Sequence, residues 1–365
     1  MKKRILIVVG TRPNFIKVTQ FPALVKGFEN LECKIVHTGQ HSDPAMSSAF
    51  FKQFNMQPDI FLNTVHTSPV AGMAGIMTEL EKVINTYKPN LLVTPGDVNS
   101  TLAAAITANK MNIPLAHLEA GLRSFDRTMP EEFNRMLTDD VSDLFFVTEQ
   151  SGYDNLIKEG HEQKNIHFVG NTMIDTLVAF GDKIEKCNIL KDLNLSSGKY
   201  ILMTMHRPAT VDSVEGLIKL CDLITSLTSK LKLVFPVHPR TIKNLEKNDL
   251  LDKLKQNKNL IIAGPLDYFA FQKMIKECLL VITDSGGIQE ETTFLKIPCL
   301  TLRSNTERPS TVLLGTNELI ALDNEIIEKR LSQIESGRYK KGVVPPLWDG
   351  SATKRIVKIL DEFLA

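Results

Sequence analysis

Short apolar runs alternate with longer amphipathic stretches along the whole chain. A first series of runs precedes residue 170, and a second series follows it. The runs are ILIVV (5–9), KIVHT (34–38), LLVT (91–94), PLAHLE (114–119) and LFFVT (144–148), then YILMTM (200–205), KLVFP (232–236), LIIAG (260–264), LLVIT (279–283) and PCLTL (298–302). Buried strands alternating with helices are typical of a doubly wound parallel α/β sheet, so each series predicts one such sheet.

The length of 365 residues also fits two domains. We place the boundary near GNTMIDT, with a first domain over 1–170 and a second over 171–350. The amphipathic stretch 351–365 predicts a last helix that packs back onto the first domain. Apolar residues make up 43% and charged residues 23% of the chain, so both domains are expected to fold fully.

Charge and cysteine content exclude several classes of partner. Lys and Arg number 43 against 42 Asp and Glu, and a net charge of +1 attracts neither nucleic acid nor an anionic membrane. The apolar run 5–9 is shorter than the core of a secretory signal, and no run is long enough to cross a bilayer. Five widely spaced cysteines predict reduced thiols. We expect a soluble cytoplasmic protein, with no nucleic-acid partner and no membrane insertion.

Polar residues gather where the predicted strands end. In open parallel sheets, ligands bind outside the carboxyl ends of the strands, so these loops are the place to look for a site. They read GTRPNFIK (10–17), TGQH (38–41), PGDVNST (95–101), HLEAG (117–121), MHRP (205–208), PVHP (236–239) and TDSGG (283–287).

The segment ITDSGGIQEE (282–291) predicts a strand, a Ser-Gly-Gly turn and a helix. Backbone N–H groups of Ser285, Gly286 and Gly287 can approach a pyrophosphate at the helix N-terminus, and Glu291 can hold ribose hydroxyls. The alternative is that Asp284 or Ser285 only caps the helix.

Three cations lie on such loops. Arg12 and Lys17 flank the predicted helix start at Pro13, and Arg308 lies in NTERPST; all three can balance diphosphate charge. The alternative for each is a solvated surface cation.

The candidate acids are Asp97, Glu119 and either Glu131 or Glu132. Clustered carboxylates can divide their pKa values, so that one acts as an acid and another as a base. A helix cap for Asp97 and a favourable first-turn charge for the other pair are the competing interpretations.

Four histidines, 41, 117, 206 and 238, lie at predicted strand ends, and their spacing fits no helical zinc motif. His206, beside Arg207, can stabilise a departing diphosphate, whereas a structural hydrogen bond is the competing role, especially for His117. The chain carries neither the G-x-G-x-x-G fingerprint after its first strand nor a P-loop.

Taken together, these motifs resemble the non-hydrolysing UDP-N-acetylglucosamine 2-epimerases from residue 5 to about residue 320. The shared segments, in the family's order, are GTRPNFIK, TGQH, GDVNST, EAGLRS, PEEFNR, GNTMIDT, PVHP, GPLDY, TDSGGIQEE and NTERP. The resemblance implies two Rossmann-like domains, as in B-type glycosyltransferases, with the active site in the interdomain cleft. It also implies removal of the C2 proton with elimination of UDP, and re-addition of UDP to a 2-acetamido glycal.

The resemblance further implies roles for individual residues. Asp97, Glu119 and Glu131 correspond to the catalytic acids and bases, and His206 assists the diphosphate. Arg135 lies near the sugar or its carboxylate partners, and the Phe271 backbone lies near uracil. The residues that hold UDP are Arg12, Lys17, Ser285, Gly286, Gly287, Glu291 and Arg308. The resemblance implies a UDP-sugar substrate, no metal or redox cofactor, and a homodimer.

Two segments depart from the family pattern. His206-Arg207-Pro208-Ala209 stands where many members read His-Arg-Arg-Glu, and 42–51 also differs. Both segments resemble the family's regulatory site, which leaves activation by UDP-N-acetylglucosamine open. LRSFDRTMPEE is similar to members acting on UDP-2,3-diacetamido uronic acids. Outside this reaction, the alternatives are a UDP-sugar glycosyltransferase, which needs an acceptor, a hydrolysing relative, which releases UDP, and a nucleotide-sugar sensor, which binds without turnover.

Overall fold

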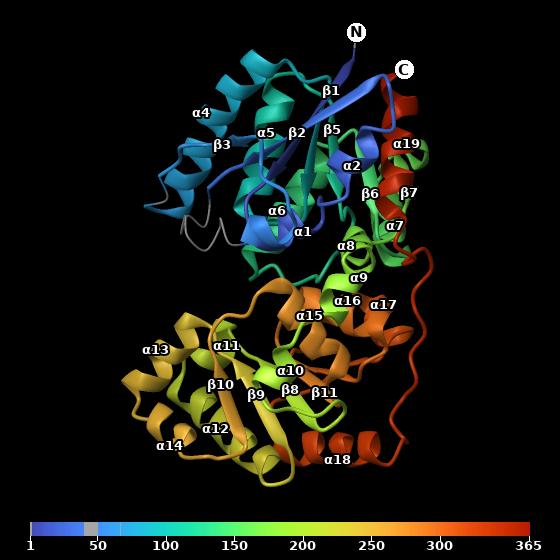
Figure 1. Cartoon of the computed structure of the whole chain (residues 1–365). Helices are drawn as coiled ribbons and strands as arrows, with labels where there is room; N and C mark the ends of the chain where they lie inside the picture. Colours follow the sequence, from blue (N-terminus) through green and yellow to red (C-terminus); the bar gives the residue numbers. More distant parts are fainter. Residues whose placement is uncertain (1, 40–49, 66) are drawn as a thin grey trace. The chain divides into compact units, whose positions relative to one another are not determined.

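A computed structural model describes residues 2–39, 50–65 and 67–365. Gln40 and His41 of the TGQH motif, and most of the divergent segment 42–51, lie outside the described residues. The chain forms two compact units (Figure 1). The first unit comprises Met1–Ala179 and Pro346–Ala365, and the second comprises Phe180–Pro345.

The first unit is built on a seven-stranded, all-parallel sheet with the order β3-β2-β1-β4-β5-β6-β7. The chain runs outward from β1 to β3, returns to the middle and continues through β4 to β7, so the order reverses between β1 and β4. The strands are β1 (Lys3–Val9), β2 (Leu31–His37), β3 (Ile60–Phe61), β4 (Leu91–Pro95), β5 (Leu115–Leu118), β6 (Leu144–Val147) and β7 (Ile166–Phe168). A ligand site is expected outside the carboxyl ends of β1 and β4.

Helices cover the sheet of the first unit and close its core. Leu6 and Val8 of β1 pack against apolar residues of α4 and α5. Ile5, Ile7 and Val9, which alternate with them along the strand, are buried as well. That double burial explains why the strand reads as a continuous apolar run. The helices are α1 (Arg12–Ile16), α2 (Phe21–Val25), α4 (Pro69–Tyr87), α5 (Asn99–Lys110), α6 (Pro130–Asp140), α7 (Gln150–Lys158), η1 (Gln163–Asn165), α8 (Thr172–Ala179) and α19 (Ala352–Leu364).

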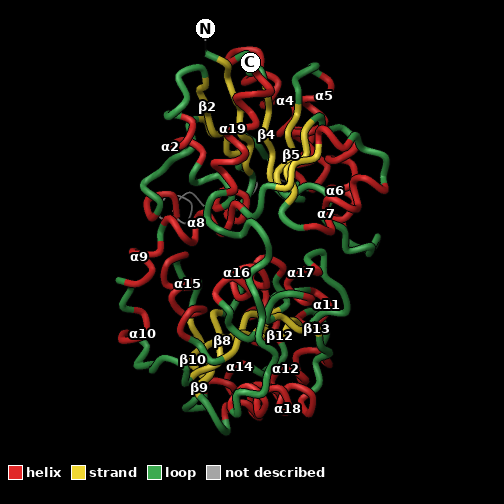
Figure 2. The backbone as a smooth tube through the Cα atoms, turned by 90° about the vertical axis from the view of Figure 1, so that its right-hand side faces the viewer, coloured by secondary structure: helices red, strands yellow, loops and turns green. Residues whose placement is uncertain are grey.

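The second unit contains a six-stranded parallel sheet with the order β10-β9-β8-β11-β12-β13 (strands in yellow in Figure 2). Its order reverses between β8 and β11. Its strands are β8 (Tyr200–Thr204), β9 (Lys232–Pro236), β10 (Leu260–Ala263), β11 (Leu280–Thr283), β12 (Cys299–Thr301) and β13 (Asn317–Leu319). Its helices are α9 (Gly181–Glu185), α10 (Ile189–Asp192), α11 (Pro208–Val211), α12 (Val214–Thr228), α13 (Pro239–Lys247), α14 (Leu251–Lys255), α15 (Tyr268–Glu277), α16 (Gly286–Leu295), α17 (Pro309–Leu313) and α18 (Asn324–Glu335).

The chain leaves the first unit after residue 179 rather than after residue 170, the predicted boundary. The difference is α8, which belongs to the first unit because Thr176 Oγ1 donates to the Ile16 carbonyl at 2.6 Å. The GNTMIDT segment therefore contains the start of α8, the last helix before the chain enters the second unit.

The returning segment is fastened to the first unit by side-chain contacts. Asp175 of α8 accepts hydrogen bonds from the backbone N–H groups of Ala352 and Thr353, at 3.0 and 2.5 Å, at the start of α19. Buried Trp348 donates its Nε1–H to the Thr148 carbonyl at 2.8 Å. Gly170 has φ +86°, and a Cβ there would lie 2.0 Å from the carbonyl oxygen of Leu347, so only glycine fits this crossing.

The structure confirms the predicted fold class of two doubly wound α/β units, and each predicted apolar run contains a strand. Among the described residues, no helix combines the length and apolar character needed to cross a membrane.

Candidate active site

In the first unit, Lys17 and Glu119 form a buried ion pair between Lys17 Nζ and Glu119 Oε2. Lys17 follows α1, after β1, and Glu119 follows β5, so the two strand ends place them together. Glu119 adopts φ +69°, a left-handed conformation that is unfavourable for a residue with a side chain. Such strain collects at functional sites and persists only where the surrounding structure holds it.

Asn14 of α1 ties this helix to the neighbouring strand end. Its Nδ2 donates to the Pro95 carbonyl at 2.9 Å, and its Oδ1 accepts from Thr11 Oγ1 at 2.7 Å. Because β1 and β4 flank the point where strand order reverses, this contact fixes the two loops on which a ligand site is expected.

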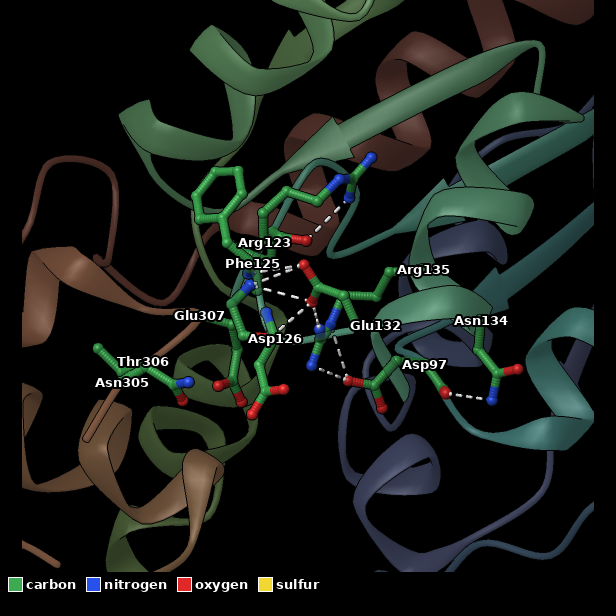
Figure 3. Close-up of polar contacts among 12 residues, drawn as sticks. Asp97, Arg123, Phe125, Asp126, Glu132, Asn134, Arg135, Asn305, Thr306 and Glu307 are labelled. Atoms are coloured by element: carbon green, nitrogen blue, oxygen red, sulfur yellow. Dashed lines mark hydrogen bonds and ion pairs between the residues drawn. The ribbon is translucent and has the colours of Figure 1, made fainter. Parts of the chain in front are cut away.

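Asp97, in the loop after β4, is paired with Arg135 of α6 (Figure 3). Arg135 Nε and Nη2 both lie near Asp97 Oδ2, at 3.0 and 2.8 Å, and Arg135 Nη1 contacts Glu132 Oε2. Asn134 Nδ2 donates to the Asp97 carbonyl at 2.9 Å. Arg135 thus lies between the carboxylates of Asp97 and Glu132.

Glu132 and Glu131, adjacent at the start of α6, occupy different environments. Glu132 is 1% exposed and accepts hydrogen bonds from Ser124 N, Ser124 Oγ and Phe125 N, at 2.8–3.0 Å. Its carboxylate is thus occupied in holding the loop after β5 (Figure 3). Glu131 is half-buried, and within the described part of the chain no hydrogen bond or ion pair engages its carboxylate. Of the two acids that the sequence left open, Glu132 is thus engaged by the loop after β5 and Glu131 is not.

His117 of β5 is fully buried, with Nδ1 2.6 Å from Asp139 Oδ1 and Nε2 2.8 Å from the Gly96 carbonyl. Asp139 also contacts Arg123 Nη2 at 2.7 Å. Burial opposes ionisation of Asp139, but His117 and Arg123 outweigh it and hold its pKa below the usual value.

In the second unit, Asp284 joins the loops that follow β8 and β11, the two strands at the order reversal. Its Oδ2 accepts from the backbone N–H groups of His206 and Arg207, at 2.8 and 2.7 Å, and its Oδ1 lies 2.9 Å from His206 Nδ1. Burial raises the pKa of Asp284, but the hydrogen bond and charge of His206 outweigh it and leave that pKa low. The contact to Nδ1 leaves His206 Nε2, on a side chain that is 43% exposed, for a ligand.

The helix α16 begins directly after this carboxylate. Ser285 is its N-cap residue and makes no side-chain cap hydrogen bond, while its N–H donates to Thr283 Oγ1 at 3.0 Å. Capping by Asp284 or Ser285, the alternative to anion binding, is therefore not what these side chains do. A Cβ on Gly286 would lie 2.7 Å from Glu307 Oε1 and 2.8 Å from Arg308 Nη1, so a larger residue at this helix start would have to displace these two side-chain ends.

Glu291, one turn into α16, is a buried carboxyl. Burial is the main reason that the pKa of Glu291 is raised to about 7, and the neighbouring Glu290 adds to the effect against a hydrogen bond from Gln272. Near neutral pH it can both donate and accept hydrogen bonds, which suits a pair of sugar hydroxyls.

The remaining predicted ligand residues differ in the contacts that their polar groups already make within the protein. Arg308 is buried, with Nε 2.8 Å from Glu290 Oε2 and Nη1 against Glu307, so its charge is already balanced. The N–H of Phe271 donates to the Asp267 carbonyl at 3.0 Å within α15 and is likewise engaged. Arg12 lies over the Phe50 ring, 5.6 Å from its centroid, and is partly exposed.

Sequence reasoning missed the side chains that hold the candidate residues. Asp284 was weighed only as a cap, and Asp139, Arg123 and Gln272 were not considered. The signal for Asp284 was its place directly after a strand and before Ser-Gly-Gly. Asp139 lies in the last turn of a helix, where nothing local distinguishes it from a surface carboxylate.

A family model described as UDP-N-acetylglucosamine 2-epimerase matches residues 24–361. The chain belongs to the UDP-N-acetylglucosamine 2-epimerase family. It is therefore an enzyme of the isomerase class. A relative from Methanocaldococcus jannaschii, named UDP-N-acetylglucosamine 2-epimerase, is 38% identical over 371 residues, which cover 98% of each chain.

One solved structure and one further relative are also similar to this chain. The crystal structure of the Methanocaldococcus jannaschii UDP-GlcNAc 2-epimerase in complex with UDP-GlcNAc and UDP has a TM-score of 0.88 and covers 98% of this chain and 99% of its own. A UDP-2,3-diacetamido-2,3-dideoxy-D-glucuronate 2-epimerase from Pseudomonas aeruginosa is 36% identical over 345 residues, covering 93% of this chain and 92% of its own.

Proposed function

We propose that the chain interconverts UDP-N-acetylglucosamine and UDP-N-acetylmannosamine at C2 without net hydrolysis. The observation that carries the proposal is the strained Glu119 paired with Lys17, on a chain 38% identical to a named UDP-N-acetylglucosamine 2-epimerase. A carboxylate held in a costly conformation beside a buried cation is suited to proton transfer.

We assign the proton transfers to Asp97, Glu119 and Glu131 as a set. A base takes the C2 proton, the electron pair of that C–H bond forms the C1–C2 double bond, and the C1–O bond breaks with its pair leaving on UDP. Protonation of C2 on the opposite face and re-addition of UDP at C1 then give the epimer. Elimination is required because C2 has no adjacent carbonyl to acidify its proton.

We assign UDP binding chiefly to the second unit. The N–H groups of Gly286 and Gly287 at the start of α16 and the outward Nε2 of His206 suit the diphosphate, and Glu291 suits the ribose. Arg12, Lys17, Ser285, Phe271 and Arg308 complete the proposed ligand set, in which Arg308 also contacts Glu290 and Glu307. The proposal includes no metal or redox cofactor.

Incubation with UDP-N-acetylglucosamine in D2O tests the reaction. We expect the manno epimer to appear with deuterium at C2, measured by proton NMR, while UDP-sugar is conserved. Release of free N-acetylmannosamine in step with turnover would contradict the non-hydrolysing route. Transfer of sugar to an added acceptor without C2 labelling would support a glycosyltransferase, and UDP-sugar binding without any turnover would support a sensor.

A second candidate substrate is a UDP-2,3-diacetamido uronic acid. It is favoured by the 36% identity to the Pseudomonas aeruginosa enzyme and by the segment LRSFDRTMPEE. Parallel assays of the two UDP-sugars decide between them, since the physiological substrate is expected to have the higher kcat/KM.

We also propose that the chain acts as a homodimer. Phe61, Val65 and Val70 of the first unit expose 56–79% of their surface, and apolar side chains so exposed are suited to contact with a second copy. Light scattering during gel filtration should give twice the chain mass of 40.8 kDa, and a monomer mass at assay concentration would refute the dimer.

A further inference from the structure

The buried His117 contacts two hydrogen-bond acceptors, one through each ring nitrogen. Its Nε2 lies 2.8 Å from the Gly96 carbonyl oxygen, which can only accept, so Nε2 carries a hydrogen. Its Nδ1 lies 2.6 Å from Asp139 Oδ1. The protonation of Asp139 therefore decides whether the ring is neutral or an imidazolium.

Asp139 Oδ2 carries no proton. It accepts from the Gly121 N–H at 3.1 Å and from Arg123 Nη2 at 2.7 Å, and both partners can only donate. One proton therefore lies between His117 Nδ1 and Asp139 Oδ1, and the two side chains form a hydrogen-bonded pair.

The pair continues into a chain of polar contacts. Arg123 also contacts Glu159, with Nη2 2.6 Å from Oε2 and Nε 2.9 Å from Oε1. With one proton shared between His117 and Asp139, these four side chains carry no net charge. This balance is what allows them to remain in the interior of the unit.

The pair touches each of the three segments that carry the candidate acids. The Gly96 carbonyl belongs to the residue before Asp97, and the Gly121 N–H belongs to the turn that contains Glu119. Asp139 lies in the last turn of α6, the helix that carries Glu131 in its first turn. The contacts run through backbone groups, so they fix where these segments lie.

We propose that the His117–Asp139 pair positions the three proton-transferring carboxylates as one unit. The proposal rests on the proposed function, because it concerns the same reaction. His117 and Asp139 are positioning residues here, since the contacts described reach backbone groups, each other and Arg123. The strained turn at Glu119 is the segment that most needs such support.

Two substitutions of His117 separate its contacts. In His117→Asn, the side-chain NH2 group lies approximately where Nδ1 lies in histidine. The variant therefore keeps a donor to Asp139 and loses the donor to the Gly96 carbonyl. In His117→Gln, the amide corresponds to Nε2, and the donor to Gly96 is kept. We expect His117→Asn to lower kcat about 100-fold, the scale of an ångström-sized misplacement, with KM and UDP affinity changed less than about three-fold. His117→Gln, which breaks the contact to Asp139, should also lower kcat, by at least about ten-fold, and a wild-type kcat in this variant would overturn the role of the pair.

Asp143→Ala is the control for stability. Asp143 Oδ2 accepts from the backbone N–H of Leu115, at 2.8 Å, at the opposite end of the same strand, and alanine removes this acceptor. This variant should lower Tm and leave kcat unchanged. A folded His117→Asn variant with kcat within three-fold of the wild type overturns the proposal, and so does a loss of kcat in Asp143→Ala that parallels its loss of Tm.

A spectroscopic test of the His117 contact to Gly96 needs no turnover. With ¹⁵N-labelled histidine, the Nε2 of His117 should show the shift of a protonated nitrogen, assigned by its absence in His117→Gln. An Nε2 without a hydrogen overturns the contact to Gly96 and with it the positioning role. A wild-type chain that turns over no UDP-sugar would refute the proposed function and the positioning role with it, whereas the NMR result still decides whether the contact to Gly96 is made.

Discussion

Replacement of Glu291 by Gln should change how the stability of the second unit depends on pH. Burial raises the pKa of the Glu291 carboxyl from the model-peptide value of 4.5 to about 7. The folded state therefore binds this proton more tightly than the unfolded state, and the stability of the unit falls as pH rises from 4.5 to 7. Gln carries no such proton, and its amide can still accept from Gln272.

The size of the effect follows from the two pKa values. A rise from 4.5 to about 7 corresponds to about 3 kcal/mol. Most of it develops between pH 5 and pH 8, so Glu291→Gln should gain roughly 2–3 kcal/mol of stability relative to the wild type over that interval.

Urea unfolding at several pH values measures the difference, and the two units can be observed separately. Trp348 is the only tryptophan and lies in the first unit, so its fluorescence follows that unit, whereas circular dichroism follows both. The gain should appear only in the transition that tryptophan fluorescence does not report. In the control Glu277→Gln, a hydrogen bond from Lys273 lowers the pKa of the replaced carboxyl, so its titration is nearly complete below pH 5. Stability curves of wild type and Glu291→Gln that stay parallel from pH 5 to 8 would refute the reasoning.

Two further predictions concern the first unit. Glu119→Gln should bind UDP with unchanged affinity in calorimetry but lose about 10²–10⁴-fold in kcat, the scale of general acid–base catalysis; near-wild-type turnover would remove Glu119 from the catalytic set. Gly170→Ala should destabilise the first unit by about 2 kcal/mol or more, because its φ of +86° is unfavourable for alanine and the Cβ meets the Leu347 carbonyl. Urea unfolding followed by tryptophan fluorescence measures the loss of stability. An unchanged midpoint would show that the backbone at Gly170 and Leu347 can move apart to make room for the Cβ.

The strands that the apolar pattern predicted are the interior ones, together with β10. The three that it missed, β3, β7 and β13, are edge strands of two or three residues and are only partly buried. An edge strand is short and only partly buried, so it contributes too few consecutive apolar residues to be recognised in the sequence. The unit boundary was placed too early for a related reason, since the contacts that assign α8 to the first unit are made by side chains far apart in sequence.

For the site, position at a strand end was sufficient to find Asp97, Glu119 and His206 as candidates. Position in the sequence could not reveal that Asp97 pairs with Arg135 or that Glu132 accepts hydrogen bonds from backbone N–H groups. It could not reveal either that Arg308 pairs with carboxylates. Such pairings depend on which side chains long-range packing brings into contact. The left-handed backbone of Glu119 was equally hidden, because glutamate gives no local signal for it.

The discontinuity of the first unit has a consequence for synthesis on the ribosome. Helix α19 buries Ile356, Val357 and Leu360 against this unit, yet it is made only after the whole of Phe180–Pro345. At about 5–20 residues per second, translation of that insert takes roughly ten to thirty seconds. During this time the second unit can complete its fold while the first still exposes the apolar surface that α19 will cover. The unit whose synthesis begins first is thus the last to complete its fold.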